Sequence, residues 1–232
     1  MAETVVAPPR LDGWTVVFDL DGTLVESAPD LLNALNHAIA PLGLAPVALS
    51  DIRTMIGKGA KAMIRAALDQ QSHHHDEDLV ERLWTEFLDH YRQNIAVDSH
   101  AFEGVTEALD ELANRGAVLA ICTNKTQALS EQLLAELGLA RHFASIVGAD
   151  AVSEKKPDAG HPLATIRQAG GDPARTIFVG DSQTDEKAAR NAGLPFIFTP
   201  LGYETATAES IEAVAILHHY SDLSDLISAI AA

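Results

Sequence analysis

Hydrophobic residues recur at two different spacings along this chain, and the spacing changes near residues 27 and 97. Between these positions apolar side chains return every three or four residues, as Leu31, Leu35 and Ile39 do, which is the spacing of a helix with one buried face. The pattern predicts helices over residues 28–39, 50–55, 60–68 and 76–91. It contains no strand signal, so we expect an all-helical segment here.

In the rest of the chain, short apolar runs alternate with helical patterns. The first run, Val16–Phe18, is β-branched and aromatic and predicts a buried strand. Further strands are predicted over residues 117–122, 145–148, 176–179 and 196–198, with a short edge strand over 214–217. Helices are predicted over residues 103–114, 127–137, 162–169, 184–191 and 223–230.

This alternation implies right-handed crossovers and a parallel sheet with helices on both faces. The chain is therefore predicted to be an α/β protein. We expect a core domain of residues 1–26 and 98–232 with an inserted all-helical cap of residues 27–97.

Two carboxylates follow the first predicted strand. Asp19 and Asp21 lie at its carboxyl end, which is where open α/β sheets bind their ligands. Their mutual repulsion is relieved if a divalent cation lies between them or if one carboxyl keeps a proton. A solvated Asp-rich turn is the alternative explanation for these two residues alone.

Polar residues also occur at or near the ends of other predicted strands. They are Thr123-Asn124, Lys155-Lys156 and the run from Gly180 to Asp185, which holds Asp181. Each has an ordinary structural explanation when taken singly, as a helix cap, a solvated pair of lysines or a turn. Because parallel strands bring their carboxyl ends to one edge of the sheet, their common position favours a shared site.

Composition narrows the range of partners. The net charge of −17 argues against nucleic acid or an anionic membrane, so an anionic substrate needs local positive charge. No apolar run approaches the length of a membrane span, and residues 1–13 lack the apolar centre of a signal peptide. The single cysteine, Cys122, fits a reducing compartment, so we expect a cytoplasmic protein.

The string Phe-Asp-Leu-Asp-Gly-Thr-Leu-Val-Glu-Ser, residues 18–27, resembles the first motif of the haloacid dehalogenase-like hydrolases. The other polar groups are similar, in order, to that family's remaining three motifs, and the match runs from about Thr15 to Gly202. Most members are Mg²⁺-dependent phosphatases. The resemblance implies a Rossmann-like sheet of order 5-4-1-2-3 with a helical cap inserted after the first motif.

The same resemblance implies roles for the motif residues. Asp19 would be the nucleophile that forms an aspartyl-phosphate, and Asp21 the general acid and base. Asp19, the backbone carbonyl of Asp21 and Asp181 would hold Mg²⁺, with Asp185 in an outer position. The groups expected to bind the phosphoryl oxygens are Gly22, Thr123, Asn124 and Lys156. Lys156 is preferred over Lys155 because the family lysine usually precedes a proline.

Residues 19–30 and 56–60 resemble those of phosphoglycolate phosphatases, although Glu26 stands where the family usually has Asp. This implies hydrolysis of a small phosphomonoester such as 2-phosphoglycolate. Another small phosphorylated metabolite, a phosphosugar mutase of the same fold and a non-catalytic binding protein remain open alternatives. The presence of Asp21 and Asp181 argues against a dehalogenase, whose family pattern lacks the second Asp and needs no metal.

The cap is expected to select the substrate. Lys58, between two glycines and before a predicted helix, is the candidate group for an anionic substrate, with a solvated lysine as the alternative. The run His73–His75 fits a solvated loop better than a metal site, because adjacent histidines do not converge. The sequence leaves monomer and homodimer equally open.

Overall fold

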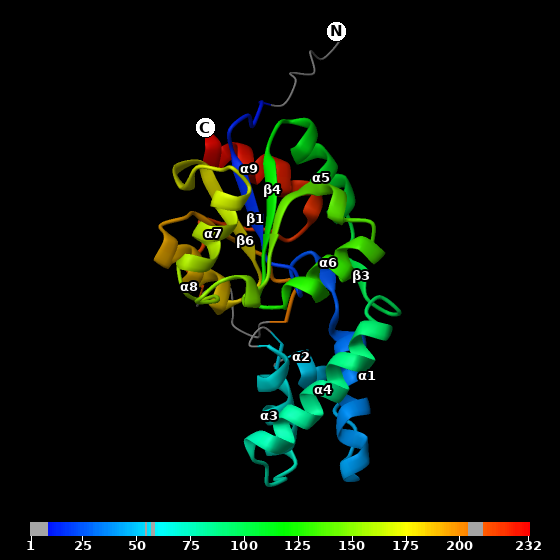
Figure 1. The fold of residues 1–232 in the computed structure, drawn as a ribbon. Coiled ribbons are helices and arrows are strands. Elements are labelled where there is room, and N and C mark those ends of the chain that lie inside the picture. The colour runs from blue at the N-terminus through cyan, green and yellow to red at the C-terminus, as the bar shows by residue number, and fades with distance from the viewer. Residues whose placement is uncertain (1–8, 54, 57–58, 204–210) are drawn as a thin grey trace.

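The computed structural model describes residues 9–53, 55–56, 59–203 and 211–232 (Figure 1). Its centre is a six-stranded sheet of order β5-β4-β1-β6-β7-β8, in which every neighbouring pair is parallel. The strands are β1 (Thr15–Phe18), β4 (Val118–Cys122), β5 (Phe143–Val147), β6 (Thr176–Gly180), β7 (Phe196–Phe198) and β8 (Ala215–Ile216). The predicted α/β fold and strand order are confirmed, with β8 as the expected edge strand.

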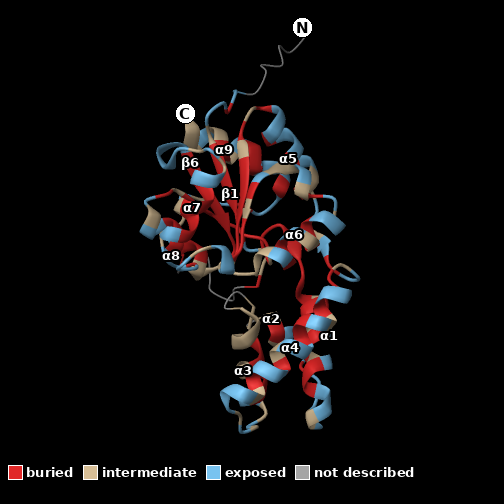
Figure 2. Ribbon diagram, in the orientation of Figure 1, coloured by how far each residue is buried: buried red, intermediate tan, exposed pale blue. Residues whose placement is uncertain are grey.

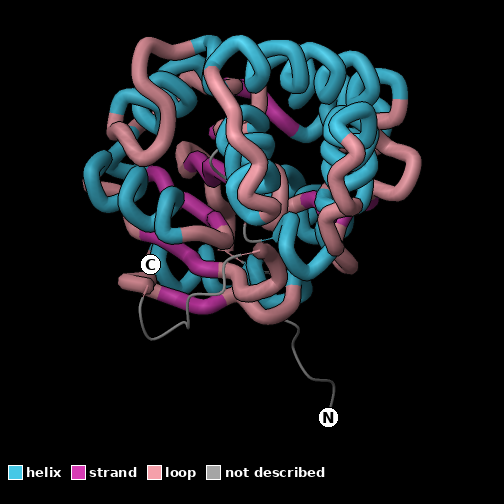
Figure 3. The backbone as a smooth tube through the Cα atoms, turned by 90° about the horizontal axis from the view of Figure 1, so that it is seen from below, coloured by secondary structure: helices cyan, strands magenta, loops and turns pink. Residues whose placement is uncertain are grey.

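Helices cover both faces of this sheet because successive side chains of a strand point to opposite faces. Val16 and Phe18 of β1 belong to one hydrophobic cluster, and Val17 belongs to the other. The first cluster includes apolar side chains of α5 (Val105–Asn114), α6 (Gln127–Glu136) and α9 (Leu223–Ala231). The second includes those of α7 (Gly160–Gln168) and α8 (Gln183–Ala192). In Figure 2 the strands are buried between these helices, and Figure 3 shows them side by side as one layer.

Four helices lie beyond one end of the sheet (Figure 1). They are α1 (Ala28–Ile39), α2 (Leu49–Arg53), α3 (Ala60–Gln70) and α4 (Glu77–Gln93). Asp76 caps α4 by accepting a hydrogen bond from the Leu79 backbone, which fixes where that helix begins. Within the described part of the chain, no helix combines the length and apolarity needed to cross a bilayer.

A small second sheet lies where the chain passes between the large sheet and these helices. Val25–Glu26 (β2) pairs antiparallel with His100–Ala101 (β3). Asp30 of α1 reinforces the junction, accepting hydrogen bonds from the backbone of Asp98 and Ser99. Neither strand was predicted, because two residues are too few to show a period.

Candidate active site

Three buried carboxyl groups meet at the carboxyl end of the sheet. Asp19 follows β1, Asp181 follows the neighbouring strand β6, and Asp185 lies in the first turn of α8. One carboxyl oxygen from each lies within 4.8 Å of the others. The backbone carbonyl of Asp21 was expected as the third ligand, with Asp185 in an outer position, whereas the third carboxyl group of this cluster comes from Asp185.

Burial makes this cluster costly when all its members are ionised. Desolvation raises the pKa of Asp19 to about 7, the ammonium of Lys156 opposes that rise, and Asp185 and Asp21 add to it. The pKa of Asp181 is raised well above its usual value, first by burial and then by Asp185 and Asp19. Buried carboxylates of this kind are stable together when a cation neutralises them, and their oxygens are the donors that Mg²⁺ prefers. The donor set therefore fits Mg²⁺.

Lys156 supplies a fixed positive charge to the same cluster. Its Nζ atom lies 2.7 Å from Asp19 Oδ1 and 2.6 Å from Asp185 Oδ1, and the side chain is almost fully buried. These carboxylates raise the lysine pKa despite its burial, so it stays charged. Lys155, in contrast, is exposed.

His161, which the sequence analysis did not consider, supports the Lys156 backbone. Its Nδ1 accepts from the Lys156 amide at 3.2 Å, and its Nε2 donates to the Val147 carbonyl at 3.0 Å. Burial lowers the pKa of His161 to about 4, so the ring is neutral and can play both roles. A single His directly before the predicted helix over residues 162–169 gives no sequence signal of this function.

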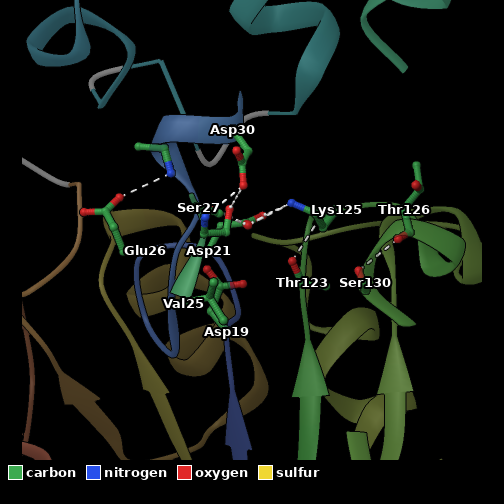
Figure 4. A network of polar contacts seen from close by, with 12 residues as sticks. Asp19, Asp21, Val25, Glu26, Ser27, Asp30, Thr123, Lys125, Thr126 and Ser130 are labelled. Atoms are coloured by element: carbon green, nitrogen blue, oxygen red, sulfur yellow. Dashed lines mark hydrogen bonds and ion pairs between the residues drawn. The ribbon is translucent and has the colours of Figure 1, made fainter. Parts of the chain in front are cut away.

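The carboxyl group of Asp21 is bound by two side chains (Figure 4). Lys125 Nζ lies 2.8 and 3.0 Å from its two oxygens, and Ser27 Oγ donates to Oδ1 at 2.5 Å. The Lys125 ammonium also lies 4.8 Å from the ring centroid of Tyr91 in α4. Lys125 was missed from the sequence, although it directly follows the Thr123-Asn124 pair at the end of β4.

Thr123 and Asn124 lie beside these groups at the end of β4. Thr123 is buried, and its Oγ1 accepts a hydrogen bond from the Lys125 amide at 3.1 Å. Asn124 Nδ2 donates to the Lys156 carbonyl at 3.1 Å, which ties the β4 loop to the lysine loop. Two of the predicted phosphate-binding residues are thereby brought next to the carboxyl cluster.

Gly22 is required by the close approach of the chain to Asp181. Its φ is +85°, and a Cβ atom at this position would lie 2.5 Å from Asp181 Oδ2. The freed space lets Thr23 Oγ1 donate to Asp181 Oδ1 at 3.2 Å, and the Tyr203 amide donates to Oδ2 at 2.9 Å. Gly22 therefore permits the close approach that positions Asp181, while its own amide donates to the Val25 carbonyl at 2.9 Å.

Tyr203 connects this site to the helices beyond the sheet. Its hydroxyl accepts from the Ser27 amide at 2.7 Å and donates to Glu26 Oε1 at 2.9 Å. The other oxygen of Glu26 accepts from Arg53 of α2 at 2.5 Å. Glu26, the departure from the usual family residue, thus still forms an ion pair across the junction.

A pocket of about 500 Å³ opens from the carboxyl cluster toward α3 and α4. At least six of the sixteen lysines and arginines line it, in a chain whose net charge is −17. They are Arg53, Lys61, Arg65, Lys125, Lys155 and Lys156. The sequence candidate Lys58 lies outside the described residues.

The haloacid dehalogenase-like hydrolase family model matches residues 16–199. The phosphoglycolate phosphatase of Agrobacterium fabrum is 43% identical over 208 residues, which are 90% of this chain and 89% of that protein. The phosphoglycolate phosphatase of Mesorhizobium japonicum is 44% identical over 209 residues, 90% of this chain and 92% of that protein.

A solved structure is also similar along nearly the whole chain. The structure of a predicted phosphoglycolate phosphatase from Haemophilus somnus superposes with a TM-score of 0.87 at 28% identity, covering 93% of this chain and 98% of that one. The parallel sheet, the carboxyl cluster at its edge and the family match agree, and the chain belongs to the haloacid dehalogenase-like hydrolases.

Proposed function

We propose that this phosphoric monoester hydrolase is a Mg²⁺-dependent phosphatase that cleaves 2-phosphoglycolate through an aspartyl-phosphate on Asp19. The observation that carries the proposal is the buried cluster of Asp19, Asp181, Asp185 and Lys156 facing a pocket rich in cations. Cationic side chains gathered in one pocket of a strongly acidic protein suit a small dianionic ester with a second acidic group, which would share these cations with their present carboxylate partners. The names of the relatives favour 2-phosphoglycolate among such esters.

In the first step, a carboxylate oxygen of Asp19 attacks phosphorus. An O–P bond forms on Asp19, and the bond between phosphorus and the ester oxygen breaks. The leaving alkoxide takes the proton of Asp21, which acts as general acid. Lys125 and Ser27 hold the carboxyl group of Asp21 and fix its direction.

In the second step, water attacks the phosphorus of the aspartyl-phosphate and gives its proton to the Asp21 carboxylate. The bond between Asp19 and phosphorus breaks, and inorganic phosphate leaves with the Asp19 carboxylate and the protonated Asp21 carboxyl group restored. Thr123 and the Asn124 backbone would bind the phosphoryl oxygens, and Lys156 would neutralise charge between the nucleophile and the phosphate. The amide of Gly22, also expected to bind them, instead donates to the Val25 carbonyl. The same groups serve both steps, since the phosphoryl group is bound in each.

Asp19, the backbone carbonyl of Asp21 and Asp181 would hold Mg²⁺, with Asp185 orienting Lys156. Bound Mg²⁺ supplies neutralisation of the charge on the phosphoryl oxygens. Its positive charge would also offset the cost of burying several ionised carboxyl groups at one place. We infer that residues 27–97 form a cap over a core of residues 1–26 and 98–232, because α3 and α4 line the pocket opposite the carboxyl cluster.

The proposed function is tested by released phosphate from a panel of phosphate esters, with no bisphosphate present so that a mutase that needs a primer stays silent. We expect 2-phosphoglycolate to give the highest kcat/KM among small esters. Failure to release phosphate from any ester would contradict a phosphatase. A strong preference for a different small ester would retain the phosphatase and change its substrate.

Activity should require Mg²⁺, because three buried carboxyl groups converge there. We expect EDTA treatment to abolish phosphate release and added Mg²⁺ to restore it. Ca²⁺ should inhibit, since its larger and looser coordination disturbs the in-line geometry. Turnover that survives exhaustive chelation would rule out the metal requirement.

Lys125→Met should lower kcat for 2-phosphoglycolate by about tenfold to a hundredfold, because Asp21 loses the ammonium that fixes both its oxygens. Lys125→Arg should recover part of the loss. The matched control is Lys187→Met on the exposed side of α8, where kcat should not change. Equal kcat values in Lys125→Met and wild type would remove Lys125 from the positioning of Asp21.

A further inference from the structure

One wall of the pocket is apolar and aromatic. Trp84, Phe87, Leu88 and Tyr91 of α4 line it at spacings of three, four and seven residues, which places them on one face of the helix. Phe87 and Tyr91 stack with ring centroids 5.7 Å apart. Met63 of α3 and Leu129 of α6 line the same pocket. We call these six residues the aromatic wall.

The aromatic wall extends from the reacting groups outward. At its inner end, Tyr91 lies beside Lys125, the partner of Asp21. Burial raises the pKa of the Tyr91 phenol to about 12, so the phenol itself is neutral beside the Lys125 ammonium. Trp84 lies two turns earlier in α4 and is only partly buried, with the Lys61 ammonium 4.3 Å from its ring centroid. A leaving group that breaks from phosphorus and takes its proton from Asp21 would therefore lie beside the wall.

A two-carbon acid makes little use of such a wall. The glycolate group has one methylene and a carboxylate, whereas pockets of roughly 300–1,000 Å³ accommodate much larger organic ligands. The volume here, about 500 Å³, lies in that range. Most residues of the wall are already buried and Trp84 alone is partly exposed, so the gain in binding comes mainly from removing the ligand's own ring from water.

We propose that this site also hydrolyses a second class of substrate, phosphomonoesters of primary alcohols that carry an aromatic ring, with the ring bound against the aromatic wall. The inference rests on the phosphoryl-transfer steps proposed above and differs in the leaving group. The same bonds form and break: water is consumed, and inorganic phosphate and the arylalkyl alcohol are released.

The kinetic test compares benzyl phosphate with ethyl phosphate, because both leave as primary alcohols and differ chiefly in the ring. We expect kcat/KM for benzyl phosphate to exceed that for ethyl phosphate by about tenfold or more, from the apolar area of the ring. Trp84→Leu should reduce this ratio at least severalfold, and Trp84→Phe should retain most of it. Trp14→Leu, which changes the other tryptophan before β1, should leave the ratio intact. A wild-type ratio near one, or a ratio that Trp84→Leu does not lower, would overturn the proposal.

A binding measurement does not depend on turnover. The chain has two tryptophans, so Trp14→Phe leaves Trp84 as the sole indole reporter. Titration with the non-hydrolysable benzylphosphonate should change its fluorescence at concentrations where ethylphosphonate has no effect. An absence of any change, while 2-phosphoglycolate is still hydrolysed, would reject the aromatic wall and retain the proposed function. If benzylphosphonate binds and benzyl phosphate is hydrolysed while 2-phosphoglycolate is not, the aromatic wall is retained and 2-phosphoglycolate is rejected as the substrate.

Discussion

Asp19→Asn is expected to lower kcat by at least about 10⁴-fold, because an amide is a poor nucleophile at phosphorus and a weaker ligand for a cation. The fold should persist, since the amide is nearly isosteric and its oxygen can still accept from Lys156. Steady-state phosphate release measures the loss, and circular dichroism checks the fold. A variant that keeps a tenth of wild-type activity would exclude Asp19 as the nucleophile.

Asp21→Asn is the matched variant at the second carboxylate. It should slow both protonation of the alcohol and breakdown of the aspartyl-phosphate, so labelled phosphate should accumulate on this protein and not on Asp19→Asn. Rapid acid quenching after mixing with labelled substrate distinguishes the two. Equal labelling of both variants, or of neither, would contradict the division of roles between these residues.

Lys156→Met should be the most destabilising substitution at the site. It leaves Asp19 and Asp185 facing each other without the ammonium that lies 2.7 and 2.6 Å from them. Removal of one partner from a buried ion pair costs about 3–5 kcal/mol, and we expect the free energy of unfolding in urea without Mg²⁺ to fall by about that amount. Activity should fall by about a hundredfold or more.

Two comparisons separate this effect from a general loss of lysine. Lys155→Met, at the exposed neighbour, should change the free energy of unfolding by less than about 0.5 kcal/mol. The double variant Lys156→Met/Asp185→Asn should recover much of the lost stability, because it removes one of the two facing charges. If the single and double variants unfold at the same urea concentration, repulsion between the carboxylates is not the cause.

The parallel sheet and the edge of it that holds the site were predictable from the alternation of apolar runs with helical patterns, and Val16–Phe18 shows its burial directly in its composition. The order of the strands was implied by the family resemblance, because alternation alone does not fix which strands are neighbours. Asp19 and Asp181 follow β1 and β6, which pair residue by residue, so adjacency of these strands brings the two carboxyl groups together. Position along a strand therefore carries much of the information about this site.

The partners of the site residues were harder to predict. Lys125 meets Asp21 across 104 positions of sequence, and Tyr203 meets Glu26 across 177. Such pairs depend on the angle at which loops leave the sheet, which hydrophobic periodicity does not encode. The direction of the Asp21 side chain was equally unpredictable. The end of the strand fixes its Cα atom, but contacts with Lys125 and Ser27 fix where its carboxyl group points.

The pairing of β2 with β3 has a consequence for how such chains diversify. The chain leaves the sheet at Val25–Glu26 and returns at His100–Ala101, and these four residues are direct hydrogen-bonded neighbours. The segment between them is therefore an insertion whose two ends are already paired. A hairpin loop of about two to five residues could join the same two strands. Insertions, deletions or wholesale exchange of the intervening helices need not move the register of β1 against β4 and β6. The carboxyl edge of the sheet and the helices that line the pocket beside it can thus change independently of each other.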